Sequence, residues 1–214
     1  MENAWIKMIE NSTEYITLYR SKLTEARNEL KKIVIESFEK NEEIQVSISG
    51  ERKIISLLIS EKLLALPIKE KIEARLVDSI NCAIEKTNKI IIEEINKMPS
   101  PHIMGEKYIN PQNEVREGKE LLMKELSIEL GKINSILVTI KSSNGEIDIS
   151  MSGSQMISSL HISRSMLTLS KKANLEQKII KVFNDAIETM NKEIINRMVE
   201  FEKGFREKDM KNNI

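Results

Sequence analysis

Residue types that carry catalysis are scarce in this chain. Cysteine occurs once, at Cys82, and the two histidines, His102 and His161, lie far apart in the sequence. The sequence has no glycine-rich phosphate loop, no His-Glu-x-x-His pattern, and no serine or cysteine with a histidine in a suitable context. We therefore expect neither an enzyme nor a bound metal or cofactor.

Contact with phosphate groups is the chemistry that the charged residues favour. One short segment carries five cations, namely Arg20, Lys22, Arg27, Lys31 and Lys32. Only Glu25 and Glu29 oppose them between residues 18 and 32. A weaker set, balanced by three glutamates, consists of Lys119, Lys124 and Lys132. The alternative is an ordinary solvated helix face, because cations also suit the negative end of a helix dipole and no aromatic residue lies among them to stack on bases.

The overall charge does not by itself indicate a polyanionic partner. Lysine and arginine total 33, and so do aspartate and glutamate. Any binding to nucleic acid therefore depends on a local basic patch. Aromatic residues make up only 4% of the chain, so the core is expected to consist mainly of Ile, Leu and Met.

The elements that must position these residues form a unit that occurs twice. Residues 44–98 match residues 147–201 after a shift of 103 positions, without a gap. Matching pairs include Gly50/Gly153, Leu57/Leu160, Asn81/Asn184, Glu85/Glu188 and Asn88/Asn191. Because the offset is constant across strand-like and helix-like segments, we interpret it as a tandem duplication.

Each unit is predicted to fold as a helix, three strands and a helix. In the first unit, a helix over residues 5–30 precedes strands at 33–36, 44–49 and 53–60, and Pro67 opens the second helix. The second unit repeats this order with a helix at 121–133, strands at 136–140, 147–152 and 156–163, and a last helix from 175 onward. We expect Gly50 to supply a positive φ in the turn before the third strand, whose Ile55, Leu57 and Ile59 face the core.

The predicted organisation is a first lobe at residues 1–98, a linker at 99–117, a second lobe at 118–203 and a tail at 204–214. Three prolines in the linker, Pro99, Pro101 and Pro111, prevent a continuous helix. No leader-like segment and no run of eighteen apolar residues is present, so we expect a soluble, cytoplasmic protein. Cys82 is matched by Asp185, which predicts an exposed, incidental thiol.

The hairpins and the helices that follow them resemble the YbaB/EbfC family of bacterial nucleoid-associated proteins. The pattern I-x-V-S-I-S-G-x-x-x-I-x-x-L-x-I-S begins at Ile44 and returns in close form from Ile147, and Asn-x-Ala-Ile-Glu follows at 81–85 and 184–188. The resemblance implies an α+β fold of two tandem α-β-β-β-α lobes, each with a three-stranded antiparallel meander. Family members pair as homodimers, so a tandem copy implies a pseudodimer within one chain.

Two functions follow from these observations. The resemblance implies binding of duplex DNA with little sequence preference, through the cations named above, in a nucleoid-associated protein. The alternative is a protein-interaction scaffold or adaptor that keeps the fold without DNA, which the zero net charge and the divergence of the lobes favour. No membrane partner is expected, and the pseudodimer could remain monomeric. Lobe–lobe contacts are expected from polar residues that recur in both long helices, namely Asn81/Asn184, Glu85/Glu188 and Asn88/Asn191.

Overall fold

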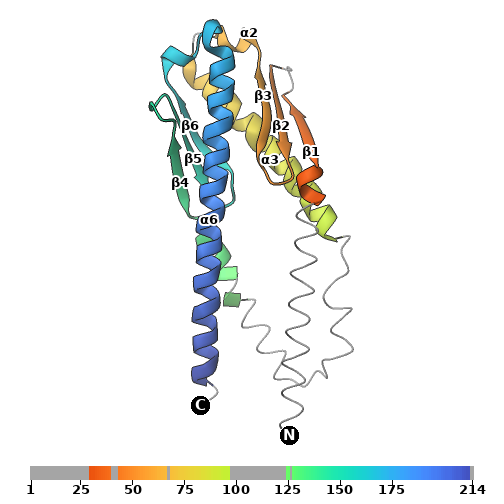
Figure 1. Ribbon diagram of the computed structural model, residues 1–214, viewed down its shortest axis with the longest axis vertical. Helices are drawn as coiled ribbons and strands as arrows, with labels where there is room; N and C mark the ends of the chain where they lie inside the picture. The colour runs from red at the N-terminus through yellow and green to blue at the C-terminus, as the bar shows by residue number, and fades with distance from the viewer. Residues whose placement is uncertain (1–28, 40–42, 67, 97–123, 126, 213–214) are drawn as a thin grey trace.

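The computed structural model describes residues 29–39, 43–66, 68–96, 124–125 and 127–212 (Figure 1). Lobe 1 contains β1 (Val34–Phe38), β2 (Ile44–Ser49), β3 (Ile54–Ile59), a short helix α2 (Glu61–Leu64) and α3 (Lys69–Asn96). Lobe 2 contains β4 (Leu137–Lys141), β5 (Ile147–Ser152), β6 (Ile157–Ile162), the 3-10 helices η1 (Arg164–Met166) and η2 (Leu169–Lys171), and α6 (Lys172–Asn212). Helical residues also precede each sheet, at 29–32 and 127–134.

Each sheet is an antiparallel meander, in the order β1-β2-β3 and β4-β5-β6. The predicted α+β fold with two three-stranded lobes is therefore confirmed. The short helices between the last strand and the long helix of each lobe were not predicted. In lobe 1 the Ser60 hydroxyl accepts a hydrogen bond from the Leu63 N–H at 3.1 Å and caps α2, whereas Ser163 forms no such cap and the chain continues into η1.

The set of β3 side chains that point into the core differs from the prediction at one residue. Ile55, expected to face the core, is 53% exposed, and Ile54 is buried in its place. The register with β2 shifts between Ser47 and Ile48, so that Ile54 pairs with Ile48 and Ile55 is an extra residue. A bulge of this kind interrupts the strict alternation of sides. Both other residues predicted to face the core are buried, and lobe 2 has the same shift at the equivalent place.

The turn before β3 also differs from the prediction, because Gly50 does not supply the positive φ. Arg52 adopts it instead, with φ 63°, and Gln155 does so in lobe 2 with φ 64°. Glycine is required at position 50 for a different reason. A Cβ atom there would lie 2.1 Å from the Leu30 carbonyl oxygen, and one at Gly153 would lie 1.7 Å from that of Ile133. Each glycine thus lets its turn pack against the helix that precedes the sheet.

One hydrophobic core joins the two lobes. The buried stripe of α3 contains Ile72, Leu76, Ile80, Ala83, Ile84 and Thr87, and its α6 counterpart contains Leu175, Ile179, Phe183, Ala186, Ile187 and Met190. Each long helix packs on its own sheet and also against the last strand of the other lobe, α3 on β6 and α6 on β3. Figure 1 shows α3 crossing behind the two sheets, so that it passes from one lobe to the other. Burial of each large apolar side chain contributes about 2 kcal/mol, which ties the lobes together.

Two predictions fall on residues outside the described ranges, namely the linker at 99–117 and the first helix up to residue 28. In the described parts of the chain, no helix has the length and apolar character that crossing a membrane requires.

Candidate functional site

The lobes meet through two asparagines that bind the edge strands of the opposite sheets. Asn184 of α6 accepts a hydrogen bond from the Ile54 N–H at 2.9 Å and donates to the Ile54 carbonyl at 3.0 Å. Asn81 of α3 makes the equivalent pair with Ile157, at 2.8 and 2.9 Å. A carboxamide that both accepts and donates satisfies an edge residue as a neighbouring strand would. The predicted lobe–lobe role of these asparagines is thus matched by direct contacts.

Two glutamates complete the same edges, and sequence reasoning missed them. Glu176 accepts a hydrogen bond from the Ile59 N–H at 2.8 Å, and Glu73 accepts one from the Ile162 N–H at 2.6 Å. Each carboxylate also lies 3.2 Å from a lysine one turn earlier, Lys172 or Lys69. The signal in the sequence was available, because Glu73 and Glu176 also differ by 103 positions.

The Glu85/Glu188 pair, which also recurs in both long helices, contacts the opposite lobe through one member only. Glu188 binds Lys53 of lobe 1 at 2.5 Å, so one member of the Glu85/Glu188 pair contacts the opposite lobe as predicted. Met156 occupies the position equivalent to Lys53 and offers no cation to Glu85. The Lys53 ammonium donates to Glu188 and thereby lowers the pKa of this carboxyl group below its ordinary value.

For Asn88 and Asn191 the prediction of a contact between lobes was wrong. Asn88 accepts a hydrogen bond from Arg52 at 2.7 Å, and Asn191 accepts one from Gln155 at 2.6 Å. Both pairs lie within one lobe. They fix the two side chains whose backbone has a positive φ, so these asparagines hold the turn before the third strand against the long helix.

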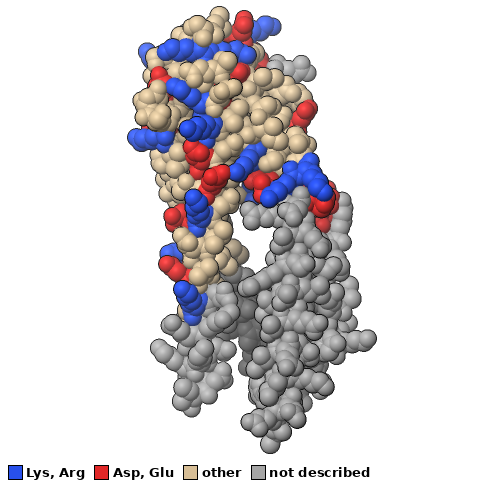
Figure 2. Space-filling model, viewed as in Figure 1, with Lys and Arg blue, Asp and Glu red and all other residues tan. Residues whose placement is uncertain are grey.

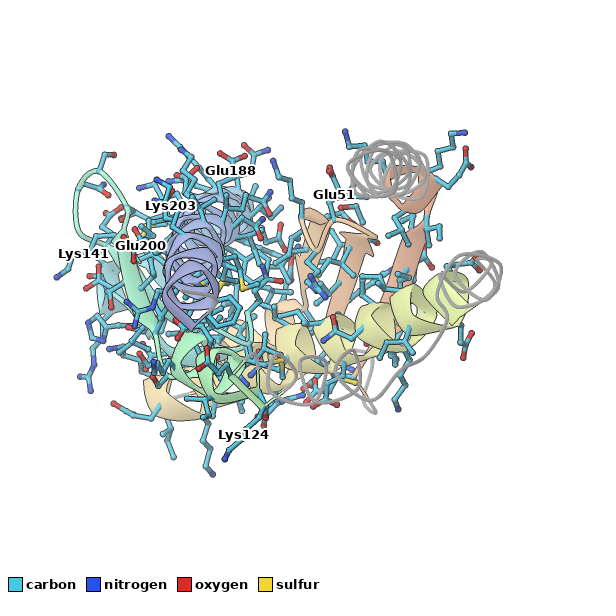
Figure 3. The ribbon with its side chains drawn as sticks, turned by 90° about the horizontal axis from the view of Figure 1, so that it is seen from below. Glu51, Lys124, Lys141, Glu188, Glu200 and Lys203 are labelled. Atoms are coloured by element: carbon cyan, nitrogen blue, oxygen red, sulfur yellow. The ribbon has the colours of Figure 1, made fainter. Side chains whose placement is uncertain are left out.

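Four of the eight predicted phosphate-contacting cations lie in the described parts of the chain, and three of these, Lys31, Lys32 and Lys132, belong to the helical ends beside the Gly50 and Gly153 turns. Lys31 lies 3.8 Å from Glu51, Lys32 lies 2.7 Å from Glu29, and Lys132 lies 3.0 Å from Glu129. Lys124 is exposed, and Figure 3 shows its side chain directed away from the body of the molecule. The remaining four predicted residues, Arg20, Lys22, Arg27 and Lys119, lie outside the described ranges.

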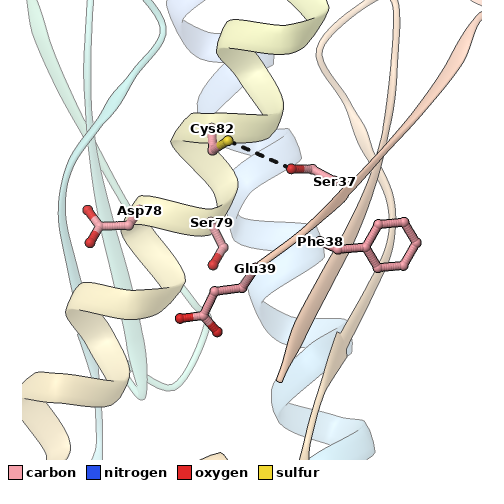
Figure 4. A pocket seen from close by; sticks show the side chains of 6 residues that line it. All are labelled: Ser37, Phe38, Glu39, Asp78, Ser79 and Cys82. Carbon is pink, nitrogen blue, oxygen red and sulfur yellow. Dashed lines mark hydrogen bonds between the residues drawn. The ribbon is translucent and has the colours of Figure 1, made fainter. Parts of the chain in front are cut away.

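Cys82 borders a shallow pocket of about 210 Å³ between β1 and α3 (Figure 4). The Ser37 hydroxyl lies 3.9 Å from its sulfur and accepts a hydrogen bond from Lys86 at 2.9 Å. Glu39, on the same rim, is held by Arg75. None of the residues that line the pocket is a histidine, and its two carboxylates belong to Glu39 and Asp78.

His161 is exposed, and it has neighbours across the lobe boundary. Its Nδ1 lies 3.1 Å from the ammonium of Lys69 and 3.8 Å from the carboxylate of Glu73. Among the described residues, no group of three or more His, Cys, Asp or Glu is arranged to hold a metal ion.

The comparison with protein families agrees with this two-lobed arrangement. The model of the YbaB/EbfC DNA-binding family matches the chain twice, at residues 8–101 and 123–205. The search of curated proteins gave no match. The two family matches cover both lobes, including the edge-binding asparagines and the glycine turns. The chain belongs to the YbaB/EbfC DNA-binding family and carries its unit twice in tandem.

Proposed function

We propose that this protein binds duplex DNA largely without sequence preference and without catalysis. Phosphate contacts come from the basic faces of the helices that precede the sheets. The contributing residues are Arg20, Lys22, Arg27, Lys31, Lys32, Lys119, Lys124 and Lys132. Contacts with phosphates carry no base information, so the binding depends on charge rather than on sequence.

The observation that carries this proposal is the double match to a DNA-binding family together with the placement of the two first helices. The helix ending at residue 32 packs against the Gly50 turn, and the helix at 127–134 packs against the Gly153 turn. These turns are equivalent in the two lobes. The two helices therefore leave the same end of the paired sheets, and both can approach one duplex.

The test is a gel-shift titration with two unrelated duplexes of equal length, each at low and at moderate salt. We expect similar affinities for both sequences, and affinity that falls as salt rises because phosphate contacts release condensed counterions. Absence of any shift at low salt, with the protein folded, overturns the proposal. A strong preference for one duplex contradicts the nonspecific mode.

Neutral variants locate the contacts. Lys31→Gln combined with Lys32→Gln should reduce the slope of log affinity against log salt by about 2, since each lost phosphate contact removes about 0.9. Lys62→Gln is the matched control, because Lys62 is an exposed lysine of α2 at the other end of lobe 1. An unchanged slope in the double variant would remove these two lysines from the contact surface.

A second candidate function, a protein-interaction adaptor, is favoured by the outer face of the lobe 1 sheet. Val34, Phe38 and Leu58 are each at least 50% exposed there. The equivalents of Phe38 and Leu58 in lobe 2 are Lys141 and His161, so only lobe 1 carries this set of apolar side chains. If a Phe38→Ser variant shifts duplex DNA as the wild type does, this face takes no part in DNA binding. It is then available for a protein partner.

The wider predictions belong to the same proposal. A chain that supplies both halves of the family's pair should be monomeric, cytoplasmic and associated with the nucleoid. The domain boundaries at residues 98, 117 and 203 remain a prediction. Light scattering of the intact chain tests the oligomeric state, and a mass of twice 24.6 kDa would contradict the monomer.

A further inference from the structure

A second basic surface lies where β6 leads into α6, and the cations predicted from the sequence do not include it. We call it the β6–α6 surface and define it by Arg164, Lys171 and Lys181, together with Lys172 and Lys178. Figure 2 shows lysine and arginine side chains gathered over the end of the molecule where α6 begins. This end is opposite to the Gly153 turn, because β6 runs between the two.

Two cations of this surface, Lys178 and Lys171, act on the carboxylate of Glu146. The Lys178 ammonium donates to Glu146, and the Ser163 N–H, next to Arg164, donates to the Glu146 carbonyl at 2.7 Å. The hydrogen bond from Lys178 lowers the pKa of the Glu146 carboxyl group, and the charges of Lys178 and Lys171 lower it further. Lys181 follows Lys178 by one helical turn. Lys178 and Lys181 therefore lie on one side of α6, and Lys171 precedes its first turn.

Lobe 1 shows that this charge is not a requirement of the fold. Arg164, Lys171 and Lys181 correspond to Glu61, Ile68 and Asp78. Across the equivalent positions 39, 43, 61, 62, 68–71, 73, 75 and 78, lobe 1 has four cations and six carboxylates, whereas lobe 2 has five cations and two carboxylates. The same backbone therefore accepts either sign of charge.

The positive charge of lobe 2 is also poorly compensated. Lys172 and Lys178 are paired with Glu176 and Glu146, but Arg164, Lys171 and Lys181 form no ion pair within the described residues. The first turn of α6 contains no acidic residue, whereas Glu70 occupies that of α3. Lysines at the positive end of a helix dipole are unfavourable by a few tenths of a kcal/mol or more, so an anionic partner would relieve the surface.

Resting on the proposed DNA binding, we propose that the β6–α6 surface is a second contact surface for the phosphates of a nucleic acid duplex. One chain then holds two duplex segments, one beside the Gly50 and Gly153 turns and one at the opposite end of the sheets. Side-chain hydroxyls of Ser165, Thr168 and Ser170, which are exposed around η1 and η2, add neutral donors for phosphate oxygens.

The test is a capture assay with the full chain. An immobilised duplex is loaded with protein, and retention of a second, fluorescent duplex is measured at two salt concentrations. The variant Arg164→Gln with Lys171→Gln is compared with Lys62→Gln with Lys71→Gln, which removes the same charge from exposed lysines at the same end of lobe 1. Melting curves verify that both variants are folded.

We expect the wild type and the Lys62/Lys71 variant to retain the second duplex. The Arg164/Lys171 variant should retain much less of the second duplex, and the salt slope of the capture that remains should be reduced by about 2, while its gel shift of a single duplex is largely kept. Normal retention by this variant overturns the inference, and so does an equal loss of single-duplex binding, which would indicate one shared surface. A wild type that shifts one duplex but never retains a second overturns the inference alone, whereas no shift at all overturns the proposed function as well.

Discussion

At the start of β3 the backbone of Ile54 is held by Asn184 of the other lobe, and at the start of β6 that of Ile157 is held by Asn81. On the surface, the same shift of 103 residues replaces Glu61 by Arg164. The comparison shows where duplicated halves are free to change. A residue that completes the opposite sheet has a backbone partner that must be kept, whereas a solvated side chain has none. The contacts to the sheet edges therefore occur in both lobes, while surface charge diverges.

The largest expected effect concerns the glycine turns, in which substitution of Gly50 or Gly153 should be equally destabilising. Gly50→Ala and Gly153→Ala each place a Cβ within about 2 Å of a backbone carbonyl, and should each cost about 3 kcal/mol or more of unfolding free energy. Urea denaturation measures the loss. Gly131→Ala, with nothing within 4 Å of the added Cβ, is the control and should be neutral or stabilising. A cost in one lobe only would break the equivalence.

The next effect concerns the asparagines between the lobes. Asn81→Leu and Asn184→Leu should each cost about 2 kcal/mol, because an edge N–H and carbonyl lose their partners at a partly buried site. Thermal melting of both variants measures the loss, and the two costs should be similar. Asn174→Leu, at an exposed position of α6, should change stability by less than about 0.5 kcal/mol. Unchanged melting of both edge variants contradicts the role that we assign to them.

A smaller effect separates backbone strain from side-chain contact at the two residues with positive φ. Arg52→Gly and Gln155→Gly should each be more stable than the corresponding alanine variant by about 1 kcal/mol. The glycine and the alanine variant both lose the hydrogen bond to the asparagine, but only the alanine variant keeps the backbone strain of a positive φ. Denaturant midpoints of the four variants test this. At Ser154, for which no positive φ is found, the order should be reversed.

The smallest expected effect is an asymmetry between the lobes. Glu188→Gln should reduce stability at pH 7 and Glu85→Gln should not, because only Glu188 has a lysine across the boundary. The folded-state pKa of Glu188 is lowered, so its contribution is present above the unfolded pKa of about 4.3 and is lost as pH falls through the lower folded value. Melting temperatures at pH 7 and pH 3 check the sign. Equal losses for both variants at pH 7 would show that the lobes do not differ here.

The repeat and the alternation of apolar residues were sufficient to predict the fold, because both report on which side chains enter the core. They could not reveal the bulge at Ile55, since two isoleucines in a row fit either facing. They also assigned the wrong reason to Gly50, because a close approach to the Leu30 carbonyl depends on an element distant in sequence. For the candidate site, periodicity located cations but not their partners. Glu51, which lies beside Lys31, comes from a turn that only the folded chain brings near.

The reciprocal hold on β3 and β6 also limits how far this polypeptide can be shortened. A half released from its companion would display an open row of N–H and C=O groups, which invites addition of foreign strands and aggregation. A chain shortened to one copy would therefore have to cover this edge by pairing with a second copy of itself.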